Sequence, residues 1–113
     1  MIEAIDSPQQ LNPSLGRPIH ILLVEDSPSD VAMTVAALRE GRIANIMHVV
    51  MDGQEALDYL RASEESPSHP RPDLILLDLN LPKLDGREVL AEIKTDDRLK
   101  VIPVVVMTTS SAE

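Results

Sequence analysis

Hydrophobic residues from position 19 onward fall into short continuous runs separated by stretches with helical spacing. The runs are rich in Val, Ile and Leu, which predicts β-strands at residues 19–24, 46–51, 74–77 and 102–107. Between them, apolar residues recur at the period of one helix face, which predicts helices at about residues 29–40, 53–62 and 86–94. The predicted order is three strand–helix pairs followed by a fourth strand.

Each predicted helix starts with the same pattern, a capping side chain followed three residues later by an acid. The pairs are Ser27 and Asp30, Asp52 and Glu55, and Asp85 and Glu88. The capping oxygen accepts a backbone N–H of the first turn, and the acid can bond back to the cap. Pro28 suits the first helical position, and Gly41 is expected to end the first helix. Asp52 and Asp85 are therefore interpreted as caps rather than as site residues.

Strands that alternate with helices indicate an α/β fold, with a parallel sheet covered by helices on both faces. Residues 63–72 are rich in Ser and Pro and are predicted as a surface loop. Residues 1–18 show no sustained apolar period and are predicted as a flexible N-terminal tail. Residues 19–113 are expected to form one domain, because a chain of 113 residues is typical of a single domain.

A net charge of −9 limits the kinds of partner that the chain can have. The acidic field repels nucleic-acid backbones and favours cations and basic protein surfaces, and Tyr59 is the sole aromatic residue available for base stacking. The absence of cysteine excludes disulfides and thiolate metal sites. An acidic N-terminus and the lack of a long apolar run predict neither a signal peptide nor a membrane span, so we expect a cytoplasmic protein.

Polar residues that can carry chemistry follow three of the predicted strands. Glu25 and Asp26 follow the first strand, Asp78 follows the third, and Thr108 follows the fourth. The carboxyl ends of parallel strands lie at one edge of a doubly wound sheet, so these side chains are expected to converge. Three close carboxylates repel one another unless a cation neutralises them, and oxygen-only ligands suit Mg²⁺. Such a site serves phosphoryl transfer, in which a carboxylate nucleophile forms an acyl phosphate.

Three motifs stand in a fixed order along the chain, and each includes the end of a predicted strand. They read Ile-Leu-Leu-Val-Glu25-Asp26-Ser, Leu-Ile-Leu-Leu-Asp78-Leu-Asn80-Leu-Pro82-Lys-Leu-Asp85-Gly86 and Ile-Pro103-Val-Val-Val-Met-Thr108. From residue 19 to the end, the chain resembles the receiver domain of two-component response regulators, which implies a flavodoxin-like doubly wound parallel sheet. The resemblance implies that Asp78 is the phosphoacceptor and that Thr108 hydrogen-bonds the phosphoryl group. The implied Mg²⁺ ligands are Glu25, Asp26, Asp78 and the backbone carbonyl of Asn80.

The same resemblance implies a function. A receiver takes a phosphoryl group from a sensor histidine kinase and passes the signal on through protein contacts, so the chain is expected to be a phosphoacceptor and not an enzyme. The segments Asp-Leu-Asn-Leu-Pro-Lys and Gly86-Arg-Glu-Val-Leu-Ala-Glu-Ile-Lys are similar to those of small stand-alone regulators paired with cyanobacterial phytochrome kinases. This similarity implies a phytochrome-type kinase as the partner.

The sequence departs from the family pattern at its end. Receiver domains have a fifth strand, further helices, a lysine that contacts the phosphoryl group and an aromatic residue that reports the switch, and the sequence stops at Glu113 before them. Neither Lys83 nor Lys100 stands at the place of that lysine. We therefore expect residues 19–113 to be an incomplete receiver, with a partly uncovered first helix, an open strand edge and a tendency to self-associate.

Three alternatives share part of this pattern. A haloacid-dehalogenase-type phosphatase also has a nucleophilic Asp after an apolar strand, but it places a second Asp where this chain has Asn80. A Rossmann-type site needs a glycine-rich turn after the first strand, where this chain has Glu25-Asp26-Ser27-Pro28. A pseudo-receiver, or a structural interaction module that never accepts phosphate, stays open. The three acids argue against it, and the missing lysine region argues for it.

Histidines and methionines are expected to have structural roles. His20, His48 and His69 share no helix face with a second ligand, so strand or loop positions are predicted for them. Four methionines are predicted to fill the core, namely Met33, Met47, Met51 and Met107.

Overall fold

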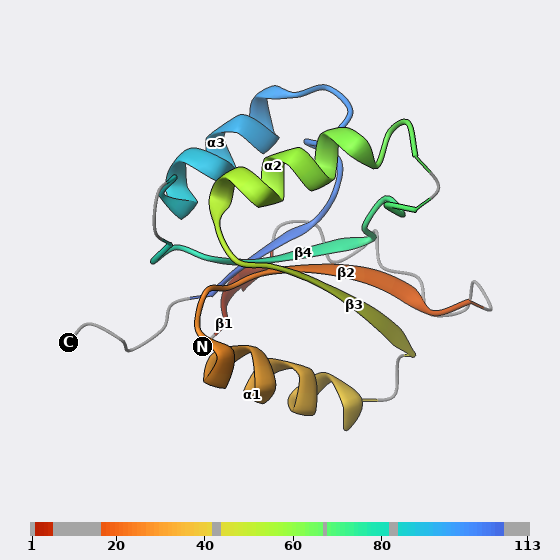
Figure 1. The fold of residues 1–113 in the computed structure, drawn as a ribbon, viewed down its shortest axis with the longest axis vertical. Coiled ribbons are helices and arrows are strands. Elements are labelled where there is room, and N and C mark those ends of the chain that lie inside the picture. Colours follow the sequence, from red (N-terminus) through yellow and green to blue (C-terminus); the bar gives the residue numbers. More distant parts are fainter. Residues whose placement is uncertain (1, 6–16, 42–43, 67, 82–83, 108–113) are drawn as a thin grey trace.

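A single sheet with helices on both faces makes up the computed structural model, which describes residues 2–5, 17–41, 44–66, 68–81 and 84–107 (Figure 1). The strands are β1 (Ile2–Ile5), β2 (Ile19–Val24), β3 (Asn45–Val50), β4 (Leu74–Asp78) and β5 (Val104–Met107). The helices are α1 (Pro28–Arg39), α2 (Gly53–Ala62) and α3 (Gly86–Thr95). Within these described residues, no helix combines the length and the apolar character needed to cross a bilayer.

The sheet has the strand order β1-β5-β4-β2-β3, in which the strands β2 to β5 are parallel to one another. This arrangement confirms the predicted doubly wound parallel sheet. The chain runs from β2 through α1 to β3 on one side and then crosses through α2 to β4 on the other, so strand order reverses at β2. The register pairs Val24 with Leu77, so Glu25 and Asp78, the next residue in each case, come side by side where β2 and β4 end.

The core lies on both faces of the sheet. Helices α2 and α3 cover one face, where Leu22, Val24, Ile75 and Leu77 pack with Ala56, Leu57, Leu60, Val89 and Ile93 (Figure 1). Helix α1 lies on the opposite face, over Ile19, Ile21, Leu23, Leu74 and Leu76. Residues Val31 and Leu38 of α1 reach this second cluster, but no residue of α1 is fully buried. The first helix is therefore only partly covered, as the sequence predicts.

The predicted helix starts are confirmed by their capping contacts. The Ser27 side chain accepts the backbone N–H of Asp30, and Asp52 accepts that of Glu55 at 2.9 Å. Asp85 forms a complete capping box with Glu88. Pro28 occupies the start of α1, and Gly41 lies just beyond its end. Local side-chain chemistry thus positions each helix directly after a strand or its turn.

The N-terminal prediction is wrong for Ile2–Ile5, which forms β1 instead of part of a flexible tail. β1 pairs antiparallel with β5, with Ile5 opposite Val105. The backbone groups on the outer side of β5 are paired by this segment. That edge of the sheet is therefore covered, whereas β3 forms the opposite edge. The other residues of 1–16 lie outside the described part of the chain.

Two further predictions need correction. Strand β5 starts at Val104 and not at Ile102, because the Ile102 N–H bonds to the Leu99 carbonyl in a turn and Pro103 has no N–H to donate. Met107 is buried, but Met33 is 66% exposed and Met51 is 45% exposed. Met33 lies on the outer side of α1, and Met51 follows the edge strand β3, so neither position faces the core.

Candidate functional site

Three acids meet where β2 and β4 end. Glu25 follows β2 directly and Asp78 is the last residue of β4, and each is only 1% exposed. Asp26 is more exposed than either. One carboxylate oxygen from each residue can be chosen so that all three lie within 4.8 Å of one another. The structure thus brings together the acids that the sequence singled out, through the pairing of neighbouring strands.

Backbone N–H groups orient the two buried carboxylates. Ser27 donates its N–H to Glu25 Oε2 at 3.1 Å, and Asn80 donates its N–H to Asp78 Oδ1 at 2.9 Å. In both cases the donor lies two residues after the acid, which is the spacing of a turn closed by a side chain. Each carboxylate is therefore held by the turn that immediately follows its strand.

Burial next to like charge perturbs this cluster. Desolvation, the largest cause, and then the neighbouring Asp78 raise the pKa of Glu25 to about 7, against the opposing hydrogen bond from the Ser27 N–H. Without a cation, the site therefore favours keeping a proton on Glu25 near neutral pH. A cation bound beside Glu25 would favour its deprotonated form.

Gly86 is a site residue that sequence reasoning interpreted only as part of a helix start. A Cβ atom at this position would lie 2.5 Å from the Asp78 carbonyl oxygen and 2.6 Å from Leu79 Cα. The first turn of α3 therefore packs directly on the backbone of the turn after β4, and only glycine permits this approach. The signal in the sequence is a glycine immediately after the Asp85 cap, close behind a strand-end acid.

The remaining predicted residues separate into three groups. Asp52 and Asp85 are helix caps, as expected, and Asp52 is buried in that role. Asn80 follows the acceptor position and is exposed, and its carbonyl as a metal ligand stays a prediction. Thr108 lies outside the described residues, so its predicted contact with a phosphoryl group also stays a prediction.

The chemistry of the donor set decides which ion fits the three acids. All the side-chain donors are carboxylate oxygens, two of them buried, and hard divalent cations prefer such ligands. Burial, and to a smaller extent the neighbouring Asp78, raises the pKa of Glu25, and a nearby cation would favour its charged form. Glu25, Asp26 and Asp78 therefore fit a divalent cation such as Mg²⁺.

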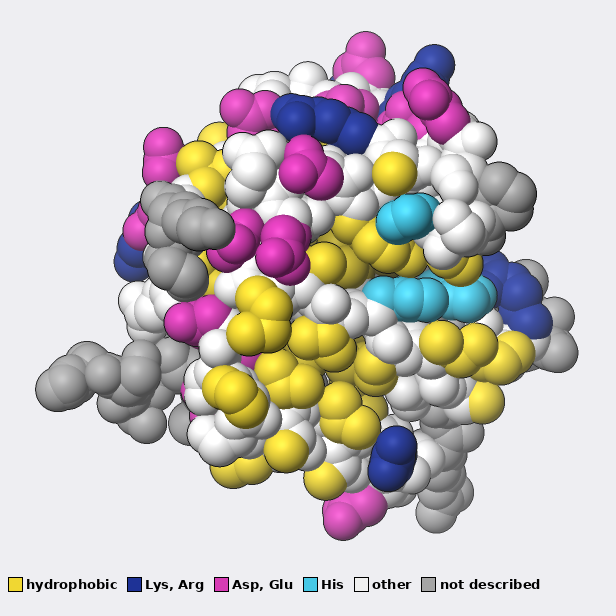
Figure 2. All heavy atoms as spheres, viewed as in Figure 1, with side chains coloured by type: hydrophobic (Ala, Val, Ile, Leu, Met, Phe, Trp, Pro, Cys, Tyr) yellow, Lys and Arg dark blue, Asp and Glu magenta, His cyan; other side chains and the backbone are white. Residues whose placement is uncertain are grey.

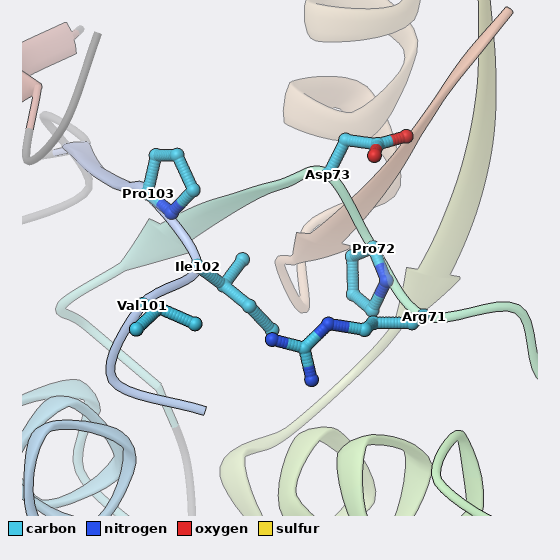
Figure 3. A pocket seen from close by; sticks show the side chains of 6 residues that line it. All are labelled: Arg71, Pro72, Asp73, Val101, Ile102 and Pro103. Carbon is cyan, nitrogen blue, oxygen red and sulfur yellow. The ribbon is translucent and has the colours of Figure 1, made fainter. Parts of the chain in front are cut away.

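A separate hollow of about 300 Å³ lies at the opposite end of the sheet, before β4 and β5. Figure 3 shows the Arg71 side chain extending toward Ile102 while the Asp73 carboxylate points away. Arg71 donates to the Arg98 carbonyl at 2.7 Å, so its guanidinium supports the chain ahead of β5. Unlike the strand-end site with its three clustered acids, this hollow has only Arg71 and Asp73 as charged residues among the described ones that line it, so the candidate functional site is the acidic cluster.

Comparison with known proteins gives a family match over most of the chain. The model of the response regulator receiver domain matches residues 21–113. The response regulator Rcp1 of Synechocystis sp. is 53% identical over 93 residues, which cover 82% of this chain and 63% of Rcp1. The chain thus spans less than two thirds of the length of that relative.

Solved structures give the same relationship. The crystal structure of the phosphorylated cyanobacterial phytochrome response regulator RcpA is 53% identical, with a TM-score of 0.75 over 84% of this chain and 68% of that one. The Mn²⁺-bound form of Rcp1 is 52% identical, with a TM-score of 0.75 over 85% of this chain and 69% of that one. On its motifs, its fold and these matches, the chain belongs to the response regulator receiver domain family.

Proposed function

We propose that the chain accepts a phosphoryl group on Asp78 from a sensor histidine kinase, with Mg²⁺ held by the neighbouring acids. The observation that carries the proposal is the burial of Asp78 beside Glu25 and Asp26 at the switch point of the sheet. Burying acids together costs stability, and a buried acid with a raised pKa, such as Glu25, is typical of functional sites. Membership of the receiver family supports the same role.

Asp78 supplies the nucleophile in this proposal. Its Oδ1 accepts the Asn80 N–H, and this bond restricts the orientation of the carboxylate. An Asp78 oxygen attacks the phosphorus of a phosphohistidine donor, so a P–O bond forms as the P–N bond breaks, and the released imidazole nitrogen keeps the electron pair. The product is an acyl phosphate on Asp78, which hydrolysis returns to the carboxylate. The chain thus acts as an acceptor and not as an enzyme with a free substrate.

Glu25, Asp26 and Asp78 would hold the cation, together with the Asn80 carbonyl expected from the family. When bound, Mg²⁺ supplies positive charge that offsets the negative charge of the acids and of the phosphoryl oxygens. Thr108 is proposed as the hydroxyl donor to the phosphoryl group. Because Glu25 must lose its proton to become a ligand, cation affinity is expected to fall as the pH drops below 7.

A phytochrome-type kinase is the proposed phosphoryl donor. The relatives at 53% identity include a cyanobacterial phytochrome response regulator, and the net charge of −9 favours a basic docking surface on the kinase. The output is proposed to pass through protein contacts.

Transfer from a labelled kinase tests this proposal. A phytochrome-type histidine kinase carrying a radiolabelled phosphoryl group should pass the label to the chain when Mg²⁺ is present. Asp78→Asn should receive none, whereas Asp97→Asn should be labelled like the unaltered chain, because the Asp97 side chain is 92% exposed and forms an ion pair with Lys100. Equal labelling of Asp78→Asn, or no transfer to the unaltered chain, would contradict the proposed role.

A further inference from the structure

The three histidines of the chain gather at one place, far from each other in sequence (Figure 2). His20 lies on β2 and His48 on β3, and the ring of Tyr59 from α2 lies between His48 and His69 of the following loop, with centroid distances of 5.7 and 5.2 Å. His20 is near the amino end of β2, so this histidine cluster lies away from the acids at the carboxyl ends. The proposed phosphoryl-transfer site does not use it.

His20 and His48 are joined through a single hydrogen bond between their rings. His20 Nδ1 and His48 Nε2 are 2.9 Å apart, with ring centroids at 5.2 Å and ring planes inclined by 23°. The contact between nitrogens at this centroid spacing means that the rings meet edge to edge. One nitrogen must donate and the other accept, so the contact holds one proton between two imidazoles.

The number of protons on the pair decides whether this bond exists. Two neutral rings form one N–H···N bond, and one neutral ring with one imidazolium forms a stronger, charge-assisted bond. Two imidazolium rings present donors to each other and lose the acceptor, so the second proton breaks the contact. The geometry therefore suits a shared proton, and because the rings interact, the pair is expected to take up its two protons in two separate steps.

The groups around the pair do not neutralise a second positive charge. Just before the start of β4, the Asp73 carboxylate accepts the His20 backbone N–H at 2.8 Å. The same carboxylate also accepts two hydrogen bonds from the guanidinium of Arg17, at 2.9 and 3.0 Å. From α2 comes the Tyr59 ring, and from the following loop comes His69, which is itself a base. Burial, His20 and His69 lower the pKa of His48, in that order.

We propose that His20 and His48 form a pH-sensitive pair that fastens the edge strand β3 to β2 and releases it when both rings are protonated. The effect extends to the loop after α2, because the Tyr59 hydroxyl donates to the Pro70 carbonyl at 2.9 Å while its ring contacts both His48 and His69. If His48 moves away, the Tyr59 ring loses the His48 ring as a packing neighbour. Acidification thus loosens β3 and residues 68–73 together.

Imidazole NMR during a pH titration tests the pair directly, because all the histidine signals of the chain come from this cluster. The pair joined by the 2.9 Å contact should take up its two protons in two separate steps, the lower one below about 6.5, because burial and the neighbouring rings lower the pKa of His48. In His20→Gln, His48 should titrate in one step. His69→Gln is the matched control, since it leaves the 2.9 Å contact in place and should keep both steps.

Amide hydrogen exchange on the same samples tests the release. Protection of the β3 amides and of residues 68–73 should fall at the lower step, while protection of β4 stays unchanged. Independent single-step titration of His20 and His48 in the unaltered chain would overturn the shared proton. Two steps without loss of β3 protection would overturn the release. Both results come from the unaltered chain, so they hold even where a variant folds poorly.

Discussion

Replacing Glu25 by Gln should stabilise the metal-free chain at alkaline pH. Burial beside Asp78 raises the Glu25 pKa from 4.5 to about 7, so the unfolded chain loses this proton at a lower pH than the folded chain does. The stability of the unaltered chain should therefore fall as the pH rises from about 4.5 to 7 and then level off. The shift corresponds to about 3 kcal/mol, which is the upper limit of the gain from Glu25→Gln at pH 8.

Urea unfolding in EDTA at pH 4, 6 and 8 measures this gain. The free energies of unfolding of Glu25→Gln and of the unaltered chain should be nearly equal at pH 4 and differ most at pH 8. Both chains contain the same histidines, so the histidine contribution to the pH dependence cancels in this comparison. Glu92→Gln is a matched control, because its side chain is 57% exposed. With Mg²⁺ the order should reverse, since the variant loses a ligand. A variant that is no more stable than the unaltered chain at pH 8 would refute the like-charge burial.

Other perturbations test the packing and one ion pair, each by urea unfolding. Gly86→Ala should cost about 1–3 kcal/mol, because its Cβ would overlap the backbone of the turn after β4, whereas the exposed Gly41→Ala should cost less; an equal cost at both positions would contradict the close approach. Leu77→Ala, at a fully buried position, should cost about 2–5 kcal/mol, and Met33→Ala should stay within about 0.5 kcal/mol; a small cost for Leu77→Ala would mean that α2 and α3 do not close over β4. Hydrogen bonding to Arg17 lowers the pKa of Asp73 below 3.8. The charged Asp73 carboxylate therefore contributes to the free energy of unfolding above pH 3.8, and this contribution is lost as the pH falls further. The deficit of Asp73→Asn should therefore shrink toward pH 2, and a constant deficit would assign the loss to packing.

The parallel sheet and its acidic site could be predicted because local signals and strand pairing point to the same arrangement. Continuous apolar runs predicted β2 and β4, and capping residues predicted where α2 and α3 begin. Once these two strands are neighbours, the acids that follow them must meet. The convergence of Glu25, Asp26 and Asp78 was therefore visible in the sequence.

Features that depend on contacts between distant segments could not be predicted in this way. The pairing of β1 with β5 depends on a free sheet edge, which the composition of residues 2–5 does not reveal. His20 and His48 were considered singly because they share no helix face, although a parallel register places them on the same face of adjacent strands. Met33 was expected in the core because its hydrophobicity does not show which side of α1 faces the sheet.

Intact-mass analysis after incubation with a small-molecule phosphodonor tests most directly whether Asp78 is a phosphoacceptor. With Mg²⁺ present, the chain should gain about 80 Da, the mass of one phosphoryl group on a carboxylate nucleophile. The gain should disappear in EDTA and in Asp78→Asn, and it should persist in Asp97→Asn. An adduct of the same mass on Asp78→Asn, or no adduct on the unaltered chain with Mg²⁺, would contradict the assignment of Asp78 as the acceptor.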